Sequence, residues 1–328
     1  MDLTLNADQQ ALRKGLTEVL ADVWPPERLR SASEGGAFDR AAWGQLADVG
    51  IFGVCVPELA GGMGLGTADA VVLAEQLGSA LMPGPLVPTF LAAGRVEGAD
   101  DGSAVVTALD MTASTPVVEY LGAATHVVLV ADDGLRLVDA AQLQADPVSR
   151  PLDPLTPVSV VRDAAGLAAA GSVLGDADDA IAWTRRGAVL TSALQVGVAR
   201  GALDLAVRYA AERTQFGRPI GSFQAIKHLL AESLVRVDLA RAAVLVAALT
   251  LDDPGVGGLD AAVASAKVLA DAAAAGNGRA CVQVHGGMGF TWEVLAHLYV
   301  KRAWLNETAF GDTKHHALAL AETIGAQQ

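Results

Sequence analysis

Cysteine and basic residues are scarce in this sequence. Its 328 residues include two cysteines, Cys55 and Cys281, which lie far apart in apolar surroundings without a Cys-x-x-Cys motif. This spacing excludes a disulfide framework and favours small, buried, reduced side chains in a reducing cytoplasm. Lys and Arg number 23 against 37 Asp and Glu, and the resulting net charge of −14 argues against a protein that binds nucleic acid or anionic membranes.

A leader segment and long apolar runs are also missing. The first residues, Met1 to Gln9, contain neither the basic nor the apolar region of a signal peptide. Elsewhere Arg, Asp or Gly interrupts each apolar run before it reaches membrane-spanning length. We therefore expect a soluble, cytoplasmic protein without membrane insertion.

Apolar residues are abundant instead. They make up 52% of the chain, and charged residues only 18%. This composition predicts a well-buried, oligomeric globular protein, and the length allows two or three domains of about 100–150 residues each.

The chain divides into three regions by its periodicity. Residues 1–95 show helical spacing, with a first run that ends at Pro25-Pro26, a second around Trp43 and a third around Val71–Leu77. Residues 96–180 carry short β-type runs between Asp-Gly and Pro turns. These runs are Val105–Leu109, His126–Val130, Leu135–Val138 and Val158–Val161. The first two regions are therefore predicted to be an N-terminal helical domain and a small β domain.

Residues 181–328 return to helical periodicity. Long helices are expected up to about Glu212, from Phe223 onward, over Leu259–Val282 and after Asp312. Short connections between four long helices predict an antiparallel four-helix bundle. The fold class is therefore mainly α with a small β domain.

Two glycine-containing loops interrupt the C-terminal helices. The first, Arg213–Gln224, reads Arg-Thr-Gln-Phe-Gly-Arg-Pro-Ile-Gly-Ser-Phe-Gln, and the second, Gln283–Phe290, reads Gln-Val-His-Gly-Gly-Met-Gly-Phe. Glycine lets a backbone approach a phosphate closely, and a guanidinium offers two donors to phosphate oxygens. Phe216 adds an aromatic face for a ring system. Plain helix-ending turns are the alternative for either loop alone, but the two together favour a site for a large anionic cofactor.

These two loops resemble the paired FAD signatures in the C-terminal domain of acyl-CoA dehydrogenases. The resemblance implies that they reach across a dimer interface to a flavin whose ring lies mainly in the neighbouring subunit. The FAD-binding residues it implies are Arg213, Phe216, Gln224, Gln283, Gly286 and Gly287. His285 lies between Gln283 and Gly286, and two interpretations of it stay open: a residue that faces the cofactor, or an ordinary loop residue.

The resemblance extends to the N-terminal region, but the middle region departs from it. Trp43, Gly50-Ile-Phe-Gly, Gly61-Gly-Met-Gly and Glu75-Gln-Leu-Gly follow the pattern of the N-terminal helical domain of that family. Family members carry a larger middle barrel, with a Thr-Glu-Pro…Gly-Ser-Asp segment and a Trp-containing strand at the flavin ring. Neither segment occurs here, so the resemblance implies a truncated middle β domain over 96–180, between domains 1–95 and 181–328.

The catalytic base of the family is also missing from its two usual positions. Proton abstraction beside a thioester carbonyl needs a partly desolvated carboxylate. The helix before the first loop reads Trp183-Thr-Arg-Arg-Gly-Ala-Val-Leu, and the position after the second loop falls on Phe310 or Gly311. Glu307 and Asp312 are the nearby acids, and a helix-start role is the alternative for Asp312. The other histidines form no metal-ligand pattern, so no metal site is predicted.

The resemblance therefore implies an FAD-dependent subunit with an incomplete active site. It is similar to the short subunit of actinobacterial α2β2 acyl-CoA dehydrogenases that act on steroid-CoA thioesters in cholesterol side-chain β-oxidation. The implied partners are a second acyl-CoA dehydrogenase-like subunit that supplies the base, a bulky acyl-CoA, and an electron-transfer flavoprotein or similar acceptor. Two alternatives stay open: a homomeric enzyme that uses an atypical acid such as Asp312, and a flavin-free scaffold subunit.

Overall fold

The computed structural model describes residues 3–35, 38–164, 166–167 and 171–325. The chain forms two compact units, each described here by itself. Unit 1 comprises Met1–Leu20, Thr67–Met82 and Ala188–Gln328, and unit 2 comprises Ala21–Gly66 and Pro83–Gly187. The division into domains 1–95, 96–180 and 181–328 stays a prediction.

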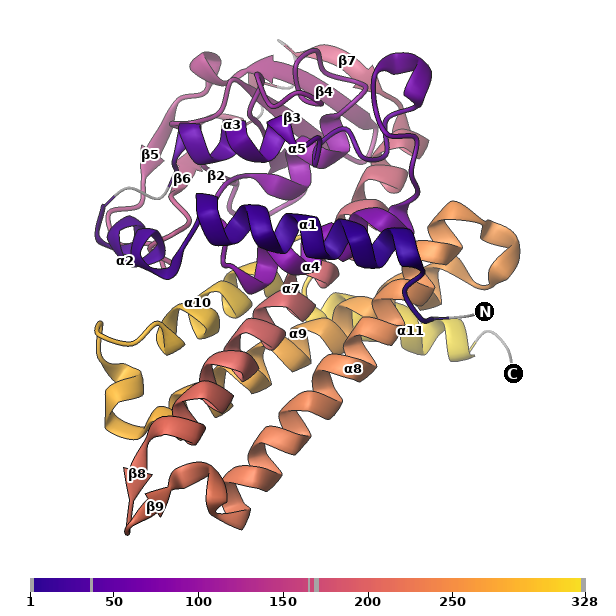
Figure 1. The fold of residues 1–328 in the computed structure, drawn as a ribbon. Helices are drawn as coiled ribbons and strands as arrows, with labels where there is room; N and C mark the ends of the chain where they lie inside the picture. Colours follow the sequence, from indigo (N-terminus) through magenta and orange to yellow (C-terminus); the bar gives the residue numbers. More distant parts are fainter. Residues whose placement is uncertain (1–2, 36–37, 165, 168–170, 326–328) are drawn as a thin grey trace. The chain divides into compact units, whose positions relative to one another are not determined.

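Unit 1 is built from long helices with short connections (Figure 1). Its C-terminal helices are α7 (Ala177–Glu212, which begins in unit 2), α8 (Gln224–Asp252), α9 (Leu259–His285), α10 (Ala296–Glu307) and α11 (Thr313–Gly325). The N-terminal part adds most of α1 (Ala7–Val23) and α4 (Thr67–Ser79). The helices expected at these positions are confirmed. None of the described helices is long and apolar enough to cross a bilayer.

Helix α10 corrects the expected count of four C-terminal helices. It has only 12 residues and carries His297, Lys301 and Arg302 among its apolar residues. The helical spacing of the apolar residues is therefore not evident from the sequence. In the structure α10 lies along α9, and one face of α10 is buried, with Leu298, Tyr299 and the stem of Arg302. Tertiary contacts therefore stabilise a helix that its periodicity does not announce.

Small residues let α4 and α7 approach backbone to backbone. A Cβ atom on Gly78 would lie 2.1 Å from the carbonyl oxygen of Leu194, and one on Gly197 would lie 2.0 Å from that of Glu75. Tyr299 of α10 joins the same contact, because its hydroxyl donates to the Ser79 carbonyl oxygen at 3.1 Å. Glycine is required here for close approach, not for an unusual backbone angle.

A buried asparagine joins three of the C-terminal helices. Asn277 on α9 donates through Nδ2 to the carbonyl oxygens of Ala199 on α7, at 3.1 Å, and Ser233 on α8, at 3.0 Å. Its Oδ1 accepts from Arg236 Nε at 2.9 Å. The amide oxygen and nitrogen thus both have partners, as a polar group with 1% exposure requires. This residue fixes the relative register of α7, α8 and α9.

A remote carboxylate caps helix α4. Asp252, the last residue of α8, accepts hydrogen bonds from the backbone N–H groups of Thr67 at 2.9 Å and Ala68 at 3.0 Å. These donors belong to the first turn of α4, where they lack intrahelical acceptors and where negative charge is favoured. The expected turn at 252–258 is confirmed, with η4 at Pro254–Val256.

Unit 2 begins with helices packed on aromatic residues. It contains α2 (Pro26–Gly35), α3 (Arg40–Asp48), η1 (Glu58–Ala60) and α5 (Leu86–Ala92). Trp43 of α3 is fully buried, its ring centroid lies 4.4 Å from that of Phe52, and its Nε1 donates to the Gly102 carbonyl oxygen at 3.2 Å. Helices α2 and α5 were not singled out by periodicity, since both are short.

The strands of unit 2 form two small sheets. Strands β1 (Val106–Asp110), β3 (His126–Ala131), β4 (Gly134–Asp139) and β7 (Ser172–Gly175) pair in the order β1-β3-β4-β7, with β1 and β3 parallel. Strands β2 (Val117–Glu119), β5 (Ala145–Pro147) and β6 (Val158–Val161) pair in the order β2-β6-β5. Leu109, Val118, Val127, Leu129 and Val161 contribute to one core shared by both sheets. The small β domain and the mainly α fold class are confirmed.

Candidate functional site

The two predicted cofactor loops lie at the same end of the unit 1 helices. The first follows α7 as a hairpin of β8 (Thr214–Gln215) and β9 (Arg218–Pro219), and the second follows α9 as the short helix η5 (Gly286–Phe290). The rings of Tyr209 and His285 stack with centroids 4.2 Å apart and join the last turns of α7 and α9. Segments 70 residues apart in the sequence are thus brought together, as the prediction of one shared site requires.

The first loop projects its central aromatic residue into solvent. Phe216 is 93% exposed and has φ = +50°, a left-handed conformation that costs a bulky residue about 1–3 kcal/mol. The neighbouring Arg218 guanidinium lies 4.1 Å from the centroid of the Phe223 ring, and Ile220 N–H donates to the Arg213 carbonyl oxygen at 2.8 Å. Its ring meets the Phe223 ring edge to face, with centroids 6.1 Å apart, and otherwise stays open to solvent among the described residues. The strain and the exposure are consistent with the predicted binding role of Phe216.

The second loop presents open backbone at its first two glycines. Gly286 has φ = +59° and ψ = −137°, which only glycine adopts without strain, and a Cβ atom on Gly286 or Gly287 would meet nothing within 4 Å. Gly289 differs, because its Cβ atom would lie 2.6 Å from the Val282 carbonyl oxygen. The first two glycines therefore leave room for a ligand, whereas Gly289 is needed for packing.

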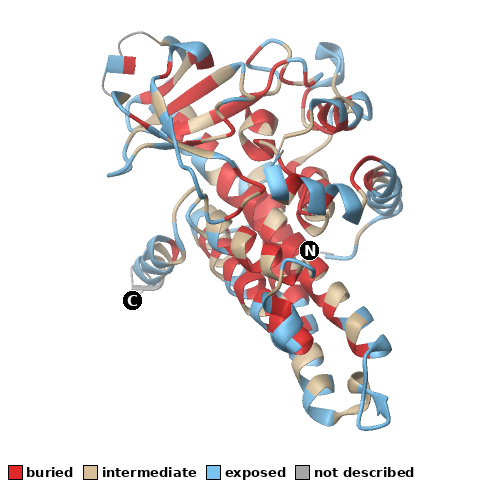
Figure 2. Cartoon of the chain, turned by 90° about the vertical axis from the view of Figure 1, so that its left-hand side faces the viewer, coloured by how far each residue is buried: buried red, intermediate tan, exposed pale blue. Residues whose placement is uncertain are grey.

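The predicted FAD-binding side chains are all exposed at this end. Figure 2 shows the hairpin of β8 and β9, at the lower end in both views, as exposed. Exposed aromatic residues of the second segment, Phe290 at 82% and Trp292 at 62%, accompany them. The exposed members of the predicted set are Arg213, Phe216, Gln224, Gln283, Gly286 and Gly287.

This arrangement fits the chemistry of FAD. Guanidinium and amide donors suit a diphosphate, open glycine backbone allows close approach, and aromatic rings offer stacking faces. His285 adds a ring that is 5% exposed and whose Nε2 has no partner among the described residues. Because Nδ1 lies 2.8 Å from the Cys281 carbonyl oxygen and must donate to it, Nε2 of the neutral ring is an acceptor available to a ligand.

The two candidate acids occupy structural positions. Asp312 accepts a hydrogen bond from the His315 backbone N–H at 2.7 Å and is the N-cap of α11, the alternative role that the sequence left open. Glu307 is half-buried near the end of α10, where its carbonyl oxygen accepts from Lys267 Nζ at 2.9 Å. Both carboxylates raise the pKa of Lys267 by Coulomb attraction against the larger lowering effect of burial. Neither contact prepares an acid for proton abstraction.

A buried ion pair that sequence reasoning missed supports this segment. Lys267 is fully buried on α9, and its Nζ lies 2.6 Å from Asp271 Oδ2 one turn later. The ammonium also donates to the carbonyl oxygens of Asn306 and Glu307 at the end of α10. The signal for this pair was available, because Lys267 and Asp271 stand four residues apart in an otherwise Ala-rich helix.

Further polar groups complete the network around Asp271. Gln195 Nε2 on α7 donates to Asp271 Oδ1 at 3.0 Å, and Thr313 Oγ1 at the start of α11 donates to Asp271 Oδ2 at 3.2 Å. Burial raises the pKa of the Asp271 carboxyl, while the Lys267 ammonium opposes that rise. The network therefore fixes the connection between α10 and α11, in which Phe310 and Gly311 both have positive φ.

The remaining titratable groups of unit 1 fit packing roles. His316 is buried, donates through Nε2 to the Phe310 carbonyl oxygen at 2.9 Å, and has a pKa that burial lowers. Burial raises the pKa of the Cys281 thiol to about 12, so this side chain is not a reactive thiolate. Within the described part of the chain, no three His, Cys, Asp or Glu side chains gather as a metal site would require.

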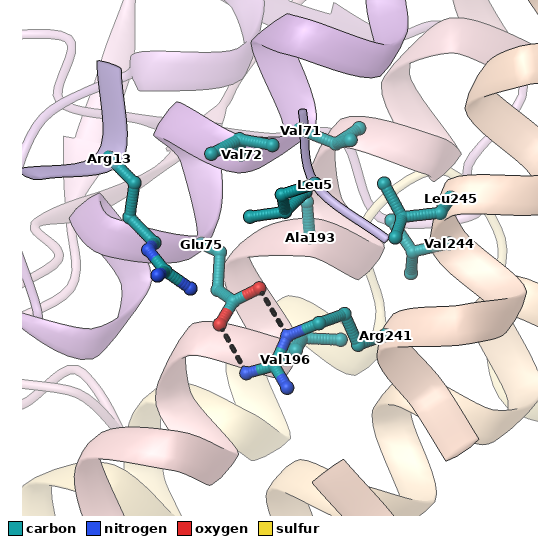
Figure 3. A pocket seen from close by; sticks show the side chains of 10 residues that line it. All are labelled: Leu5, Arg13, Val71, Val72, Glu75, Ala193, Val196, Arg241, Val244 and Leu245. Atoms are coloured by element: carbon teal, nitrogen blue, oxygen red, sulfur yellow. Dashed lines mark hydrogen bonds and ion pairs between the residues drawn. The ribbon is translucent and has the colours of Figure 1, made fainter. Parts of the chain in front are cut away.

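A small cavity of unit 1 lies away from both loops. It has about 10 Å³, room for about one water molecule, and Arg241 holds Glu75 in a bidentate ion pair at its wall (Figure 3). The hydrogen bonds to Glu75 raise the pKa of Arg241. The other lining residues are Leu5, Arg13, Val71, Val72, Ala193, Val196, Val244 and Leu245. Its size excludes an acyl chain or a dinucleotide, so we assign it to packing.

Two sequence profiles match the chain. That of the acyl-CoA dehydrogenase N-terminal domain matches residues 6–96, and that of the acyl-CoA dehydrogenase C-terminal domain matches residues 179–325, which includes both loops. Acyl-CoA dehydrogenase IpdE2 of Mycobacterium tuberculosis is 34% identical over 310 residues, which cover 92% of each chain. Acyl-CoA dehydrogenase FadE34 of the same organism is 36% identical over 318 residues, but the match spans 88% of this chain and only 40% of FadE34.

A solved structure agrees over nearly the whole length. The chain superposes on a variant of the Tcur3481-Tcur3483 steroid acyl-CoA dehydrogenase with a TM-score of 0.84 and 27% identity, covering 99% of this chain and 100% of the other. The chain belongs to the acyl-CoA dehydrogenase family of flavin-dependent oxidoreductases.

Proposed function

We propose that this chain is the short subunit of a heteromeric, FAD-dependent acyl-CoA dehydrogenase, with a flavin site that a second acyl-CoA dehydrogenase-like subunit completes. One observation carries the proposal: the predicted FAD-binding residues all lie exposed at one end of unit 1, while the nearby acids Glu307 and Asp312 serve the α10–α11 connection. The chain thus offers the binding half of a site without a base of its own.

Each group at this end has a defined task in the proposed site. Arg213, Gln224 and Gln283 supply donors to the diphosphate and its neighbouring polar atoms, and Phe216 supplies a stacking face. The backbone N–H groups at Gly286 and Gly287 approach the same anion. When bound, the flavin supplies the acceptor for the hydride that leaves the β carbon. A carboxylate of the partner subunit removes the α proton.

The proposed substrate is a bulky acyl-CoA, such as a steroid side-chain CoA ester in cholesterol β-oxidation. Support comes from the similar structure of the Tcur3481-Tcur3483 steroid acyl-CoA dehydrogenase, whose name joins two proteins. We accordingly propose an α2β2 assembly in the cytoplasm that passes electrons to an electron-transfer flavoprotein or a similar acceptor.

Substitution of the first-loop arginine tests the proposal. In the complex with its partner subunit, Arg213→Ala should lower the FAD affinity roughly 10–100-fold, because a charge-assisted hydrogen bond contributes about 1.5–3 kcal/mol. The flavin content per tetramer after gel filtration, read from visible absorbance, and titration of the apo complex with FAD measure this effect. Arg200→Ala is the matched control, since Arg200 is half-exposed on α7 and forms a half-exposed ion pair with Asp204 one turn later.

The two alternatives predict different results. A flavin-free scaffold subunit predicts the same FAD content in the Arg213→Ala and wild-type complexes. A homomeric enzyme predicts a yellow, active single chain that loses activity on Asp312→Asn. Either result would replace the shared-site proposal.

A further inference from the structure

His285 is almost fully buried in unit 1, and one of its ring nitrogens remains accessible to solvent. The residue is 5% exposed, and its ring stacks on Tyr209 at 4.2 Å with 26° between the planes. Nδ1 lies 2.8 Å from the Cys281 carbonyl oxygen. Because a carbonyl oxygen can only accept, Nδ1 must carry the hydrogen.

The second ring nitrogen, Nε2, is not paired within the protein. None of the described residues offers it a hydrogen bond or an ion pair, and it is not among the polar atoms fully sealed from solvent. A ring held by stacking and by one hydrogen bond, with a single unpaired and accessible nitrogen, is a preorganised acceptor for a ligand.

The ring that carries this nitrogen adjoins both predicted cofactor loops. Tyr209, which stacks on the ring, precedes Arg213 by one helical turn, and Gly286 directly follows His285. Among the groups predicted to bind the cofactor, the Arg213 guanidinium and the Gly286 and Gly287 N–H groups only donate, and the side-chain amides of Gln224 and Gln283 each offer one acceptor oxygen beside their donors. Donors suit the diphosphate, but the hydroxyl and amino groups of a nucleoside need an acceptor.

We propose that His285 Nε2 accepts a hydrogen bond from the adenosine half of the dinucleotide, through a ribose hydroxyl or the adenine amino group. This inference rests on the proposed FAD site and adds a binding residue to it. In the neutral ring the Nδ1–H is committed to Cys281, so Nε2 is the acceptor and favours these donors over phosphate oxygens. His285 would thus bind the nucleoside, while the donors of the two loops bind the negatively charged diphosphate.

The test uses the apo complex of this chain with its partner subunit and two substitutions of His285. In His285→Asn, the short amide retains a donor for the Cys281 carbonyl and removes the atom at Nε2. In His285→Gln, the longer amide restores an acceptor at that distance. We expect His285→Asn to weaken FAD binding roughly 3–10-fold, the range of one neutral hydrogen bond, and His285→Gln to stay close to wild type.

Competition by ADP locates the contact on the ligand. ADP carries the adenosine and the diphosphate without the flavin, so His285→Asn should weaken ADP competition by the same factor as FAD binding. Unchanged ADP competition beside weaker FAD binding would overturn the assignment to adenosine. His315→Asn, an exposed histidine on α11, is the matched control and should leave both affinities unchanged.

Three further outcomes separate this inference from the proposed function. Wild-type FAD affinity in His285→Asn together with a loss in Arg213→Ala would overturn the role of His285 and leave the shared site standing. Equal losses in His285→Asn and His285→Gln, with equally lowered melting temperatures, would assign His285 to packing alone. Full FAD affinity in both Arg213→Ala and His285→Asn would reject the proposed site itself.

Discussion

At the scale of single residues, the buried ion pair Lys267–Asp271 lies between two helix ends of opposite polarity. Lys267 donates to two carbonyl oxygens at the end of α10, where cations are favoured, and Asp271 accepts from Thr313 at the start of α11, where anions are favoured. Desolvation of two charges is costly, so the pair stabilises the fold only because each charge has several partners. Its effect is to hold the α10–α11 connection.

Removal of one charge should expose that dependence. Lys267→Met leaves Asp271 buried without its counter-ion and leaves the carbonyl oxygens of Asn306 and Glu307 without their donor, so we expect a loss of about 3–5 kcal/mol in the free energy of unfolding. Urea denaturation followed by tryptophan fluorescence measures the loss. Lys227→Met on the exposed face of α8 is the control, with an expected change within about 0.5 kcal/mol.

The double variant Lys267→Met/Asp271→Leu sharpens this test. It removes both charges, so it should recover part of the stability lost in Lys267→Met. A double variant less stable than the single one would show that the carbonyl and hydroxyl contacts, not the ion pair, dominate the network.

At the scale of elements, the contact between α4 and α7 depends on three glycines rather than on large side chains. Gly78 of α4 faces the Leu194 carbonyl oxygen, while Gly197 and Gly201 of α7 face the carbonyl oxygens of Glu75 and Ser79. Because glycine has no side chain, the backbones of α4 and α7 come into direct contact at each of these positions. The N-terminal segment Thr67–Met82 is thereby packed into the C-terminal helices of unit 1.

A single methyl group should separate these helices. In Gly197→Ala the new Cβ would lie 2.0 Å from the Glu75 carbonyl oxygen and 2.7 Å from Ser79 N, so the backbones must move apart, at a cost of at least about 1–3 kcal/mol. Thermal unfolding measures the change. Gly15→Ala on α1 is the control with the opposite sign, because its Cβ would meet nothing within 4 Å and alanine favours a helix by about 0.5–1 kcal/mol. Equal effects of the two substitutions would refute the close-contact argument.

At the scale of the whole molecule, several large apolar side chains lie exposed on unit 1. The loop end presents Phe216, Phe290 and Trp292, and α8 presents Leu234, Val235 and Leu239 at 42–56% exposure. Exposed patches of this kind mark protein–protein interfaces. With only 18% charged residues, the chain has few groups to keep such patches soluble.

Expression with and without the partner subunit tests the assembly. We expect the chain alone to be colourless and aggregation-prone, and the co-expressed chain to elute as a yellow heterotetramer. Native mass spectrometry and the flavin absorbance of the purified species measure both properties. A yellow, monodisperse homomer would contradict the shared site and direct the search for the base to Asp312 and Glu307.

Much of the fold and the loop positions could be predicted from the sequence. Apolar residues at helical spacing predicted α1, α4, α7, α8 and α9, and Pro, Asp and Gly predicted the turns between them. The two predicted cofactor loops could be identified because each combines glycine with arginine or amide donors, which suit an anionic ligand and are local features of the sequence. The sequence did not predict short elements such as α2, α5, α10 and β7, because each has too few residues for its apolar periodicity to be recognised.

The tertiary structure alone decided how distant residues combine. It brought the two loops to one end through the stacking of Tyr209 on His285, and it placed the Asp312 carboxylate where it caps the start of α11. It also paired Lys267 and Asp271 with Gln195 and with the ends of α10 and α11. A sequence specifies donors, acceptors and periodicity, but burial and partners arise only when separate helices meet, and those decide the role of a charged or aromatic side chain.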